Sequence, residues 1–152
     1  MNRYAFQSFA HGILKIGYTD SAVFLIQRAE EIDTENEPSL LSELAFGQIR
    51  EYLSGQRSSF DFPFTLIGTL FAQKVWAAIQ QIPYGETRSY KQLASSIGNP
   101  SASRAVGMAN RINPLLIVVP CHRIIGSNGQ LVGYAGGLEM KKALLSLEQR
   151  PS

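Results

Sequence analysis

The residues Asn113-Pro114-Leu115-Leu116-Ile117-Val118-Val119-Pro120-Cys121-His122-Arg123 form the most informative stretch of the chain. Between the two prolines, residues 115–119 are an unbroken run of branched apolar side chains. This length and composition predict a strand that is buried on both faces, although a run this short does not exclude a helix. Pro120 lacks a backbone donor and keeps the preceding residue extended, so we expect the strand to end there.

Two reactive side chains follow the predicted strand. Cys121 is the only cysteine in the chain, and His122 comes directly after it. Only about 3% of an ordinary cysteine is ionised at pH 7, so a thiolate nucleophile needs a base nearby. The pair therefore suits nucleophilic catalysis. The alternative is that Cys121 is a small buried apolar residue and His122 is merely its neighbour.

The composition is that of an ordinary globular protein. The 152 residues suit one domain or two small lobes, and 45% hydrophobic with 17% charged residues give no sign of disorder. A single cysteine excludes an internal disulfide and a cysteine-rich zinc site. No apolar run approaches the ~18 residues of a membrane span, and no leader-like segment opens the sequence. We therefore expect a cytoplasmic protein with no membrane partner.

The net charge of +2 conceals an asymmetry between the two parts of the chain. Residues 1–65 contain five Lys/Arg and nine Asp/Glu, a balance of −4, whereas residues 66–152 contain nine Lys/Arg and three Asp/Glu, a balance of +6. A basic C-terminal part favours a polyanionic partner, although basic faces are also commonly just solvated.

Residues 1–65 are predicted to form a small α/β lobe with a scaffolding role. Residues 4–27 are rich in aromatic and β-branched side chains, and two turns interrupt them, which predicts an antiparallel sheet of about three strands with His11 in a turn. An acidic connector, residues 29–38, leads to a helix that begins at Ser39 and ends at Gly55. The predicted inner face of that helix consists of Leu40, Leu44, Ile49 and Leu53.

Residues 66–152 are predicted to form a mostly helical domain, which makes the fold class α+β. A helix begins near Thr69, and its apolar stripe of core residues is Phe71, Val75, Ile79 and Ile82. We expect a hairpin turn at residues 126–129, a glycine-rich loop at residues 133–137 and a final helix over Leu138–Glu148. In that helix Met140, Leu144 and Leu147 are predicted to face the core, with Glu148 near the same side.

A helix-turn-helix is predicted between these helices. Ser89 and Gln92 form a capping box that begins the first helix, which stops at Gly98, and Asn99-Pro100 is expected to begin the second. The predicted inner face of the second helix is Ala102, Ala105, Val106 and Ala109, and its basic outer face is Arg104, Gly107, Met108 and Arg111. The pattern alone is weak, because helical hairpins are common in proteins that do not bind DNA.

Six motifs that occur in order identify a family resemblance. They are Ile82-Pro83-Tyr84-Gly85, Ser89-Tyr90-Lys91-Gln92-Leu93-Ala94, Arg104-Ala105-Val106-Gly107, Asn113-Pro114, Pro120-Cys121-His122-Arg123 and Gly133-Tyr134-Ala135-Gly136-Gly137. Together they resemble the O6-alkylguanine-DNA alkyltransferases, which remove alkyl groups from guanine in DNA. The match is best over residues 69–148, and residues 1–65 match only loosely, as the variable α/β lobe of that family.

The resemblance implies roles for the residues around the thiol. Cys121 would be the alkyl acceptor, His122 the base that acts on it through a bound water, and Glu148 the carboxylate that orients His122. Asn113 would brace the helix-turn-helix against the active-site strand. Tyr90 would help to rotate the target nucleotide out of the duplex and to protonate the departing guanine.

The resemblance also implies a DNA surface and a base pocket. Arg104 would fill the space that the extruded base leaves. The other DNA contacts would be Tyr90, Ala102, Gly107, Met108, Arg111 and Arg123. The pocket would be closed by Tyr134, Ala135 and Gly136, and the carbonyl groups of Cys121 and Ile124 would accept from the guanine amino group.

Two departures from the family pattern have consequences. Some members carry a zinc site built from cysteines and histidines, but Cys121, His11 and His122 are the only such residues here, so we expect no metal. Ala135 stands where some members have serine. The smaller side chain could admit bulkier alkyl groups.

The function that we predict is single-turnover DNA repair, in which an alkyl group, methyl first, moves from guanine O6 to Cys121. The expected partner is double-stranded DNA that carries O6-alkylguanine, and we expect a monomer that needs no cofactor and is nucleoid-associated when bound to DNA. One alternative is a Cys-His hydrolase, which would leave the helix-turn-helix without a purpose. The other is a non-catalytic module that recognises alkylated DNA, although such relatives typically lack the acceptor cysteine.

Overall fold

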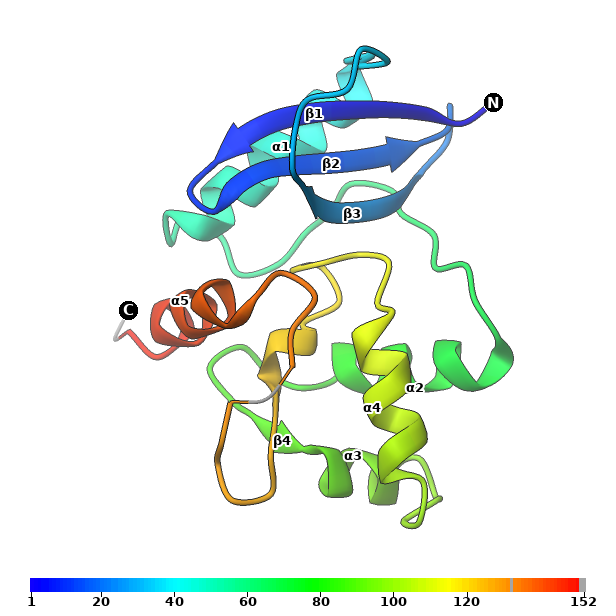
Figure 1. Cartoon of the computed structure of the whole chain (residues 1–152), viewed down its shortest axis with the longest axis vertical. Helices are drawn as coiled ribbons and strands as arrows, with labels where there is room; N and C mark the ends of the chain where they lie inside the picture. Colours follow the sequence, from blue (N-terminus) through cyan, green and yellow to red (C-terminus); the bar gives the residue numbers. More distant parts are fainter. Residues whose placement is uncertain (132, 151–152) are drawn as a thin grey trace. The chain divides into compact units, whose positions relative to one another are not determined.

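The computed structural model describes residues 1–131 and 133–150, so residue 132 and residues 151–152 of the predicted C-terminal domain lie outside the described residues. The chain divides into two units (Figure 1). One unit consists of Met1–Ile67 and Pro114–Val118, and the other of Gly68–Asn113 and Val119–Ser152. The stretch 114–118 therefore packs with the N-terminal residues, although it lies far from them in the sequence.

The N-terminal unit is built on the predicted three-stranded sheet. Strands β1 (Arg3–Phe9), β2 (Gly12–Tyr18) and β3 (Val23–Ala29) pair antiparallel in the order β1-β2-β3, so the predicted meander is confirmed. Helix α1 (Leu40–Leu53) crosses one face of this sheet (Figure 1). The core of this unit includes the buried residues Leu14, Ile16 and Ile26.

Helix α1 begins as predicted but buries only part of the predicted face, since Ile49 is buried and Leu53 is partly buried. Ser39 caps the helix through a reciprocal pair of hydrogen bonds with Ser42. Leu40 and Leu44, which we expected in the core, are 92% and 46% exposed. The buried residues are Ser42, Ala45, Phe46, Gln48, Ile49 and Tyr52. The prediction placed the leucines inside because they repeat at i and i+4, but the row that contains Ala45, Ile49 and Tyr52 has the same spacing.

In the C-terminal unit, helix α2 (Leu70–Gln80) supports the predicted helical pair. Val75, Ile79 and Ile82 are buried, as the stripe predicted, and Phe71 is only partly so. The indole N–H of Trp76 donates to the carbonyl of Ala109, 2.9 Å away, which ties α2 to α4.

The predicted helix-turn-helix is present and consists of α3 (Tyr90–Ser96) and α4 (Ser103–Arg111). The Ser89–Gln92 capping box is confirmed. Gly98 adopts φ of 78°, and it ends α3 by donating its N–H to the Ser95 carbonyl. This close turn brings α4 beside both α2 and α3 (Figure 1).

Helix α4 begins later than predicted. Asn99-Pro100 lies in the turn, and Ala102 holds the cap position without a side-chain hydrogen bond. The buried face is Val106, Ala109 and Asn110, whereas Ala105 is exposed. Two of the four predicted positions, Val106 and Ala109, are thus buried, and the polar Asn110 was not predicted.

The strand predicted over residues 115–119 is wrong. Leu115 forms one isolated parallel bridge with Ile26, and the backbone then turns sharply. Ile117 has φ of 74°, and the N–H of Val118 donates to the Leu116 carbonyl at 2.9 Å, so the buried segment is a strained γ-turn. Its apolar side chains are buried as predicted, but an apolar run carries no information on backbone direction.

A second tight turn delivers the reactive residues. Pro120 has φ of −77° and ψ of 61°, and the N–H of Cys121 donates to the Val119 carbonyl at 2.7 Å. A short 3-10 helix, η1 (Cys121–Arg123), follows, and β5 (Ile124–Ile125) then pairs in parallel with β4 (Arg88–Ser89). Cys121 therefore begins a 3-10 helix instead of ending a strand.

The remainder of the C-terminal unit agrees largely with the sequence. Residues 126–129 form the predicted turn, in which the N–H of Gly126 donates to the Gln130 carbonyl. No strand follows this turn in the described residues, and β5 pairs with β4 instead, so the turn does not close a hairpin. Helix α5 (Leu138–Glu148) has the predicted bounds and buries Met140, Leu144, Leu147 and Glu148. The α+β class is confirmed. None of the helices in the described residues is long and apolar enough to cross a membrane.

Candidate active site

The Cys121 thiol lies in the interior of the C-terminal unit. Its residue is 1% exposed, and the amide Nδ2 of Asn113 lies 3.0 Å from Sγ and 2.9 Å from the Val119 carbonyl. One buried amide thus fixes both the thiol and the residue that precedes Pro120. Asn113, predicted as a brace between α4 and the active-site segment, is located between these two elements.

The environment of the thiol opposes its ionisation. Burial raises the pKa of Cys121 to about 11, although the Asn113 hydrogen bond and the Lys141 charge pull it down. Water cannot solvate a thiolate at this depth. A base within the protein is therefore needed for the sulfur to react near neutral pH.

His122 and Glu148 form a buried pair. Nε2 of His122 lies 2.6 Å from Oε2 of Glu148, and both side chains are almost fully buried. Because a carboxylate accepts, Nε2 carries the proton and Nδ1 keeps its lone pair. Within residues 1–131 and 133–150, Nδ1 has no hydrogen-bond partner. Burial lowers the pKa of His122, so the ring is neutral at pH 7 and Nδ1 can accept a proton.

Arg123 corrects one prediction. We expected it to contact DNA, but it is 7% exposed. Its Nε donates to Oε1 of Glu148 at 2.7 Å, and one terminal nitrogen donates to the Ile82 carbonyl at 2.7 Å. The guanidinium is therefore engaged inside the unit and holds the carboxylate that pairs with His122. The position of Arg123 directly after Cys121 and His122 in the sequence does not indicate whether the 3-10 helix directs its side chain toward the interior or toward solvent.

Lys141 is a site residue that the sequence reading missed. It is fully buried, and its Nζ donates to the carbonyls of Ile124 at 2.6 Å and Gly133 at 3.3 Å. Burial lowers the pKa of Lys141 to about 8. Its position was visible in the sequence, because Lys141, Leu144 and Glu148 repeat at i, i+3 and i+7 on the inner face of α5.

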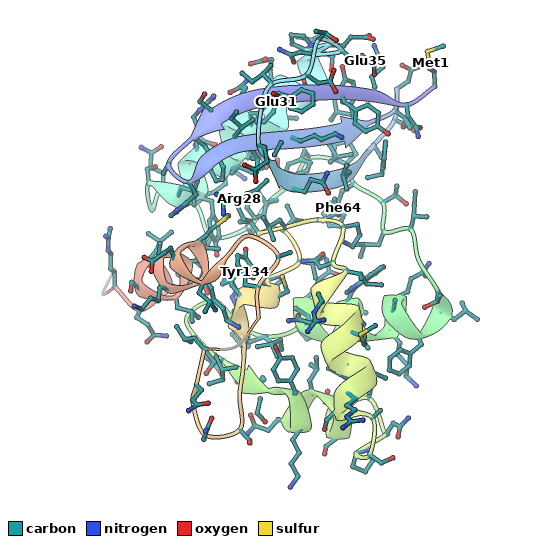
Figure 2. All side chains as sticks on the ribbon, viewed as in Figure 1. Met1, Arg28, Glu31, Glu35, Phe64 and Tyr134 are labelled. Atoms are coloured by element: carbon teal, nitrogen blue, oxygen red, sulfur yellow. The ribbon has the colours of Figure 1, made fainter. Side chains whose placement is uncertain are left out.

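A cavity of about 520 Å³ opens beside α4 in the same unit. It is lined by Tyr90, Ser103, Arg104, Gly107, Met108, Asn110, Arg111, Gly133 and Tyr134. Tyr134 extends from the loop that precedes α5 (Figure 2). Its ring packs edge-on against the His122 ring, with the two ring centroids 6.3 Å apart. The cavity therefore combines the basic face of the helix-turn-helix with Tyr134, which contacts His122.

Tyr90 lines this cavity and lies near enough to Cys121 for the two groups to interact electrostatically. Its pKa is raised, chiefly by burial and further by the nearby Cys121 charge, while a hydrogen bond from Asn110 lowers it. The ring also packs near Gly107, where an added Cβ would lie 3.8 Å from the tyrosine carbons. The hydroxyl therefore stays protonated at neutral pH.

The other predicted residues divide between surface and interior. Arg104, Met108 and Arg111 are exposed on α4, and Ala102 and Gly107 are partly exposed. In the loop, Ala135 is exposed and Gly136 is buried. The two carbonyls predicted to receive the guanine amino group are already acceptors, since that of Cys121 receives the Ile124 N–H and that of Ile124 receives Lys141. Among the described residues, no group of three or more His, Cys, Asp or Glu could hold a metal.

Comparison with known proteins places this site in a family. Residues 70–150 match the family model described as the 6-O-methylguanine DNA methyltransferase, DNA binding domain. A methylated-DNA–protein-cysteine methyltransferase from Methanosarcina acetivorans is 55% identical over 101 residues, 66% of this chain, which spans 65% and thus just under two thirds of that relative. One from Mycobacterium leprae is 45% identical over 133 residues, covering 82% of this chain and 81% of the relative.

Solved structures agree with the sequence relatives over nearly the whole chain. The crystal structure of a Mycobacterium tuberculosis O6-methylguanine methyltransferase has a TM-score of 0.88 at 41% identity, covering 98% of this chain and 93% of that one. The structure of a Mycobacterium tuberculosis relative in complex with DNA has a TM-score of 0.88 at 42% identity, and the match covers 97% of this chain and 92% of that one. The resemblance inferred from the six motifs is confirmed. The chain belongs to the 6-O-methylguanine DNA methyltransferase family.

Proposed function

We propose that the protein repairs DNA by moving an alkyl group, methyl first, from O6 of guanine to Sγ of Cys121, once per molecule. The observation that carries this proposal is the buried Glu148–His122 pair, which leaves an imidazole lone pair in the interior that holds the only thiol. A protein that only recognised alkylated DNA would have no use for this pair. The names of the relatives support the same activity.

The transfer begins with loss of the thiol proton. His122 takes this proton at Nδ1 through a bridging water, and Glu148 stabilises the resulting imidazolium. The positive charges of His122 and Lys141 then face the thiolate, which offsets part of the cost of burying it. General-base assistance of this kind typically accelerates a reaction by about 10²–10⁴-fold.

The thiolate then displaces guanine from the alkyl carbon. A sulfur–carbon bond forms as the carbon–O6 bond breaks, and the electron pair of the broken bond stays with guanine. Tyr90 donates to the guanine ring and supports its protonation as it leaves. The product is a thioether at Cys121, which water does not cleave, so each molecule acts once.

The α3–α4 pair brings DNA to the cavity. Arg104 and Arg111 supply positive charge on an exposed face, and Gly107 and Ala102 allow close approach in the narrow minor groove. Arg104 inserts where the extruded nucleotide was stacked. Extrusion costs about a few kcal/mol, and less for an alkylated base that pairs poorly. The DNA complex of the Mycobacterium tuberculosis relative supports DNA as the partner.

The remaining predicted residues complete the site. Tyr134, Ala135 and Gly136 close over the base, while Asn113 holds the thiol in place. Residues 1–65 act as a scaffold, and residues 66–152 carry both DNA binding and chemistry. We expect the protein to act as a monomer, because every group assigned to the reaction comes from one chain.

Replacement of the nucleophile tests the proposal. Cys121→Ser should abolish methyl transfer from a duplex oligonucleotide with labelled O6-methylguanine, while affinity for that duplex stays within about threefold, because groove contacts do not use the thiol. Ser127→Ala in the exposed turn serves as the matched surface control. Substantial transfer by the Cys121 variant would overturn the assignment.

A further inference from the structure

The motif Ile82-Pro83-Tyr84-Gly85 is one of those that identify the family, yet the proposed reaction gives it no role. It follows α2 and forms a turn, in which the N–H of Glu86 donates to the Pro83 carbonyl at 3.0 Å. Hydrogen bonds at both ends of the motif hold this turn beside the C-terminal end of α5.

Both ends of the turn are anchored near Glu148. The Ile82 carbonyl accepts from a terminal nitrogen of Arg123 at 2.7 Å. The Gly85 carbonyl accepts from Nε2 of Gln149 at 2.7 Å. Gly85 has φ of 87°, and a Cβ there would lie only 3.1 Å from the Glu148 carbonyl, so glycine permits this close approach. The side chain between the two anchors is therefore held in place.

That side chain is Tyr84, and its ring lies over Arg123. The guanidinium carbon is 5.6 Å from the ring centroid, within the roughly 6 Å of a cation–π contact. Tyr84 is 37% exposed, whereas the Arg123 side chain is only 8% exposed. The partly exposed ring therefore shields the guanidinium from water.

Arg123 in turn acts on the protonation of the Glu148–His122 pair. Its Nε and its other terminal nitrogen donate to the two oxygens of Glu148, at 2.7 and 3.1 Å, and Oε2 also pairs with His122. Burial lowers the pKa of His122, Glu148 raises it, and the charges of Arg123 and Lys141 lower it further. A guanidinium that turned away into water would make the pair bind a proton more tightly.

We propose that Tyr84 is a positioning residue of the proposed alkyl transfer, whose ring holds Arg123 on Glu148 and thereby keeps His122 unprotonated and able to accept the thiol proton. The proposal rests on the proposed function and adds to it a role for the turn at residues 82–85. Two observations carry it, the cation–π contact and the anchors on either side of the ring.

Other titratable groups face the two side chains that the proposal connects. Those around His122 are Cys121, Arg123, Tyr134, Lys141 and Glu148. Those around Tyr84 are Arg123, Glu148 and Arg150. All of them stay in the chain when Tyr84 is replaced, so a change in the titration of His122 reports the loss of the ring.

The test follows the ring signals of the two histidines, His11 and His122, by NMR while the pH is lowered from neutral. In Tyr84→Leu the His122 midpoint should lie at least about half a pH unit above that of wild type, because a loosened Arg123 no longer opposes protonation of the coupled pair. Tyr84→Phe keeps the ring and should titrate as wild type does. The measurement uses no DNA, so its outcome does not depend on alkyl transfer.

Two references accompany this titration. His11 lies in a turn of the N-terminal unit, and its midpoint should be the same in every form of the protein. Tyr4→Leu is the matched control, because it removes a ring whose centroid lies 4.7 Å from Nζ of Lys15 in the N-terminal unit. It should leave the His122 midpoint at its wild-type value.

A rate measurement and a stability measurement complete the test. Single-turnover transfer from a duplex with O6-methylguanine should lose rate on the acid side of its pH profile, by about threefold in Tyr84→Leu at a pH where His122 is largely protonated. A merely structural Tyr84 would lower the thermal midpoint and leave the His122 titration unchanged, and equal titrations of Tyr84→Leu and wild type overturn the inference. An equally large shift in Tyr84→Phe would also overturn it, since the hydroxyl would then be responsible. Absence of transfer by wild type at every pH would instead overturn the proposed function.

Discussion

Nε2 of His122 and Oε2 of Glu148 are 2.6 Å apart, and both side chains are almost completely excluded from solvent. The Glu148 carboxylate also accepts a hydrogen bond from Nε of Arg123, 2.7 Å away. Two side chains from adjacent positions of η1 therefore hold this carboxylate. This arrangement fixes the imidazole tautomer, because only Nδ1 is left with a lone pair. It is the structural reason to expect that His122 acts as a base.

Glu148→Gln should therefore slow methyl transfer by about 10²–10⁴-fold at neutral pH, because the amide no longer stabilises the imidazolium. The deficit should shrink as the pH approaches the Cys121 pKa of about 11, where the thiol ionises without help. The measurement is the alkylation rate with the free base O6-benzylguanine from neutral to alkaline pH. Glu86→Gln changes an exposed carboxylate and is the control.

A variant whose rate deficit stays the same at every pH would show that Glu148 serves folding alone. Thermal unfolding of Glu148→Gln must be recorded alongside, because the substitution also weakens the Arg123 contact. Loss of one partner of a buried ion pair typically costs about 3–5 kcal/mol. Rates are therefore compared at temperatures where both proteins are folded.

Arg123→Met should destabilise the protein without weakening its electrostatic attraction to DNA. Glu148 would be left buried without its guanidinium, at a cost of about 3–5 kcal/mol in the free energy of unfolding. The slope of log affinity against log salt should remain that of wild type. Arg111→Gln, which removes an exposed charge from α4, should reduce that slope by about 1. A smaller salt-dependence slope in Arg123→Met than in wild type would show that Arg123 contacts DNA after all.

The sequence predicted elements well where one local signal decided them. The Ser89–Gln92 capping box and the bounds of α5 follow from neighbours within a few positions, and both are confirmed. Strands β1 to β3 could be predicted because turn residues separate them in the sequence. The Cys-His-Glu constellation came from family motifs, and the structure brings His122 and Glu148 together across 26 positions of sequence.

Other features depend on tertiary contacts that no local pattern encodes. The run 115–119 looked like a strand because its side chains are buried, yet Ile117 has φ of 74°, which β-branched residues rarely adopt. Packing against β3, where Leu115 bridges Ile26, outweighs that strain. The spacing of Lys141 from Leu144 and Glu148 indicates the inner face of α5, but lysine is seldom fully buried, and its acceptors here are backbone carbonyls, which a side-chain pattern does not indicate.

Lys141 should make stability depend on pH in the alkaline range. Its pKa falls from 10.5 to about 8 on folding, so between these values the unfolded chain binds more protons and stability rises with pH. Below pH 8 both states are protonated, and the buried charge costs about 3 kcal/mol. Urea unfolding in a Cys121→Ser background removes the opposite contribution of the thiol. Addition of Lys141→Met to that background should abolish the rise, and equal pH profiles for the two proteins would contradict the assignment.

Arg104→Ala should slow repair of duplex DNA far more than reaction with free O6-benzylguanine. The free base needs no extrusion, so an inserted arginine has nothing to replace. We expect a loss of at least about tenfold on the duplex and less than about twofold on the free base. Arg57→Ala in the N-terminal unit is the control. Equal losses on both substrates would assign Arg104 to chemistry or folding instead of DNA handling.

We propose that Cys121 accepts one alkyl group from DNA and keeps it. The most direct test is to incubate the protein with excess duplex that carries labelled O6-methylguanine and to follow label per protein, with the modified peptide mapped by mass spectrometry. We expect a plateau at one methyl group per molecule, all of it on Cys121, with the repaired base left in the duplex as unmodified guanine. Continued turnover beyond one equivalent, or a methyl group on any other residue, would contradict it.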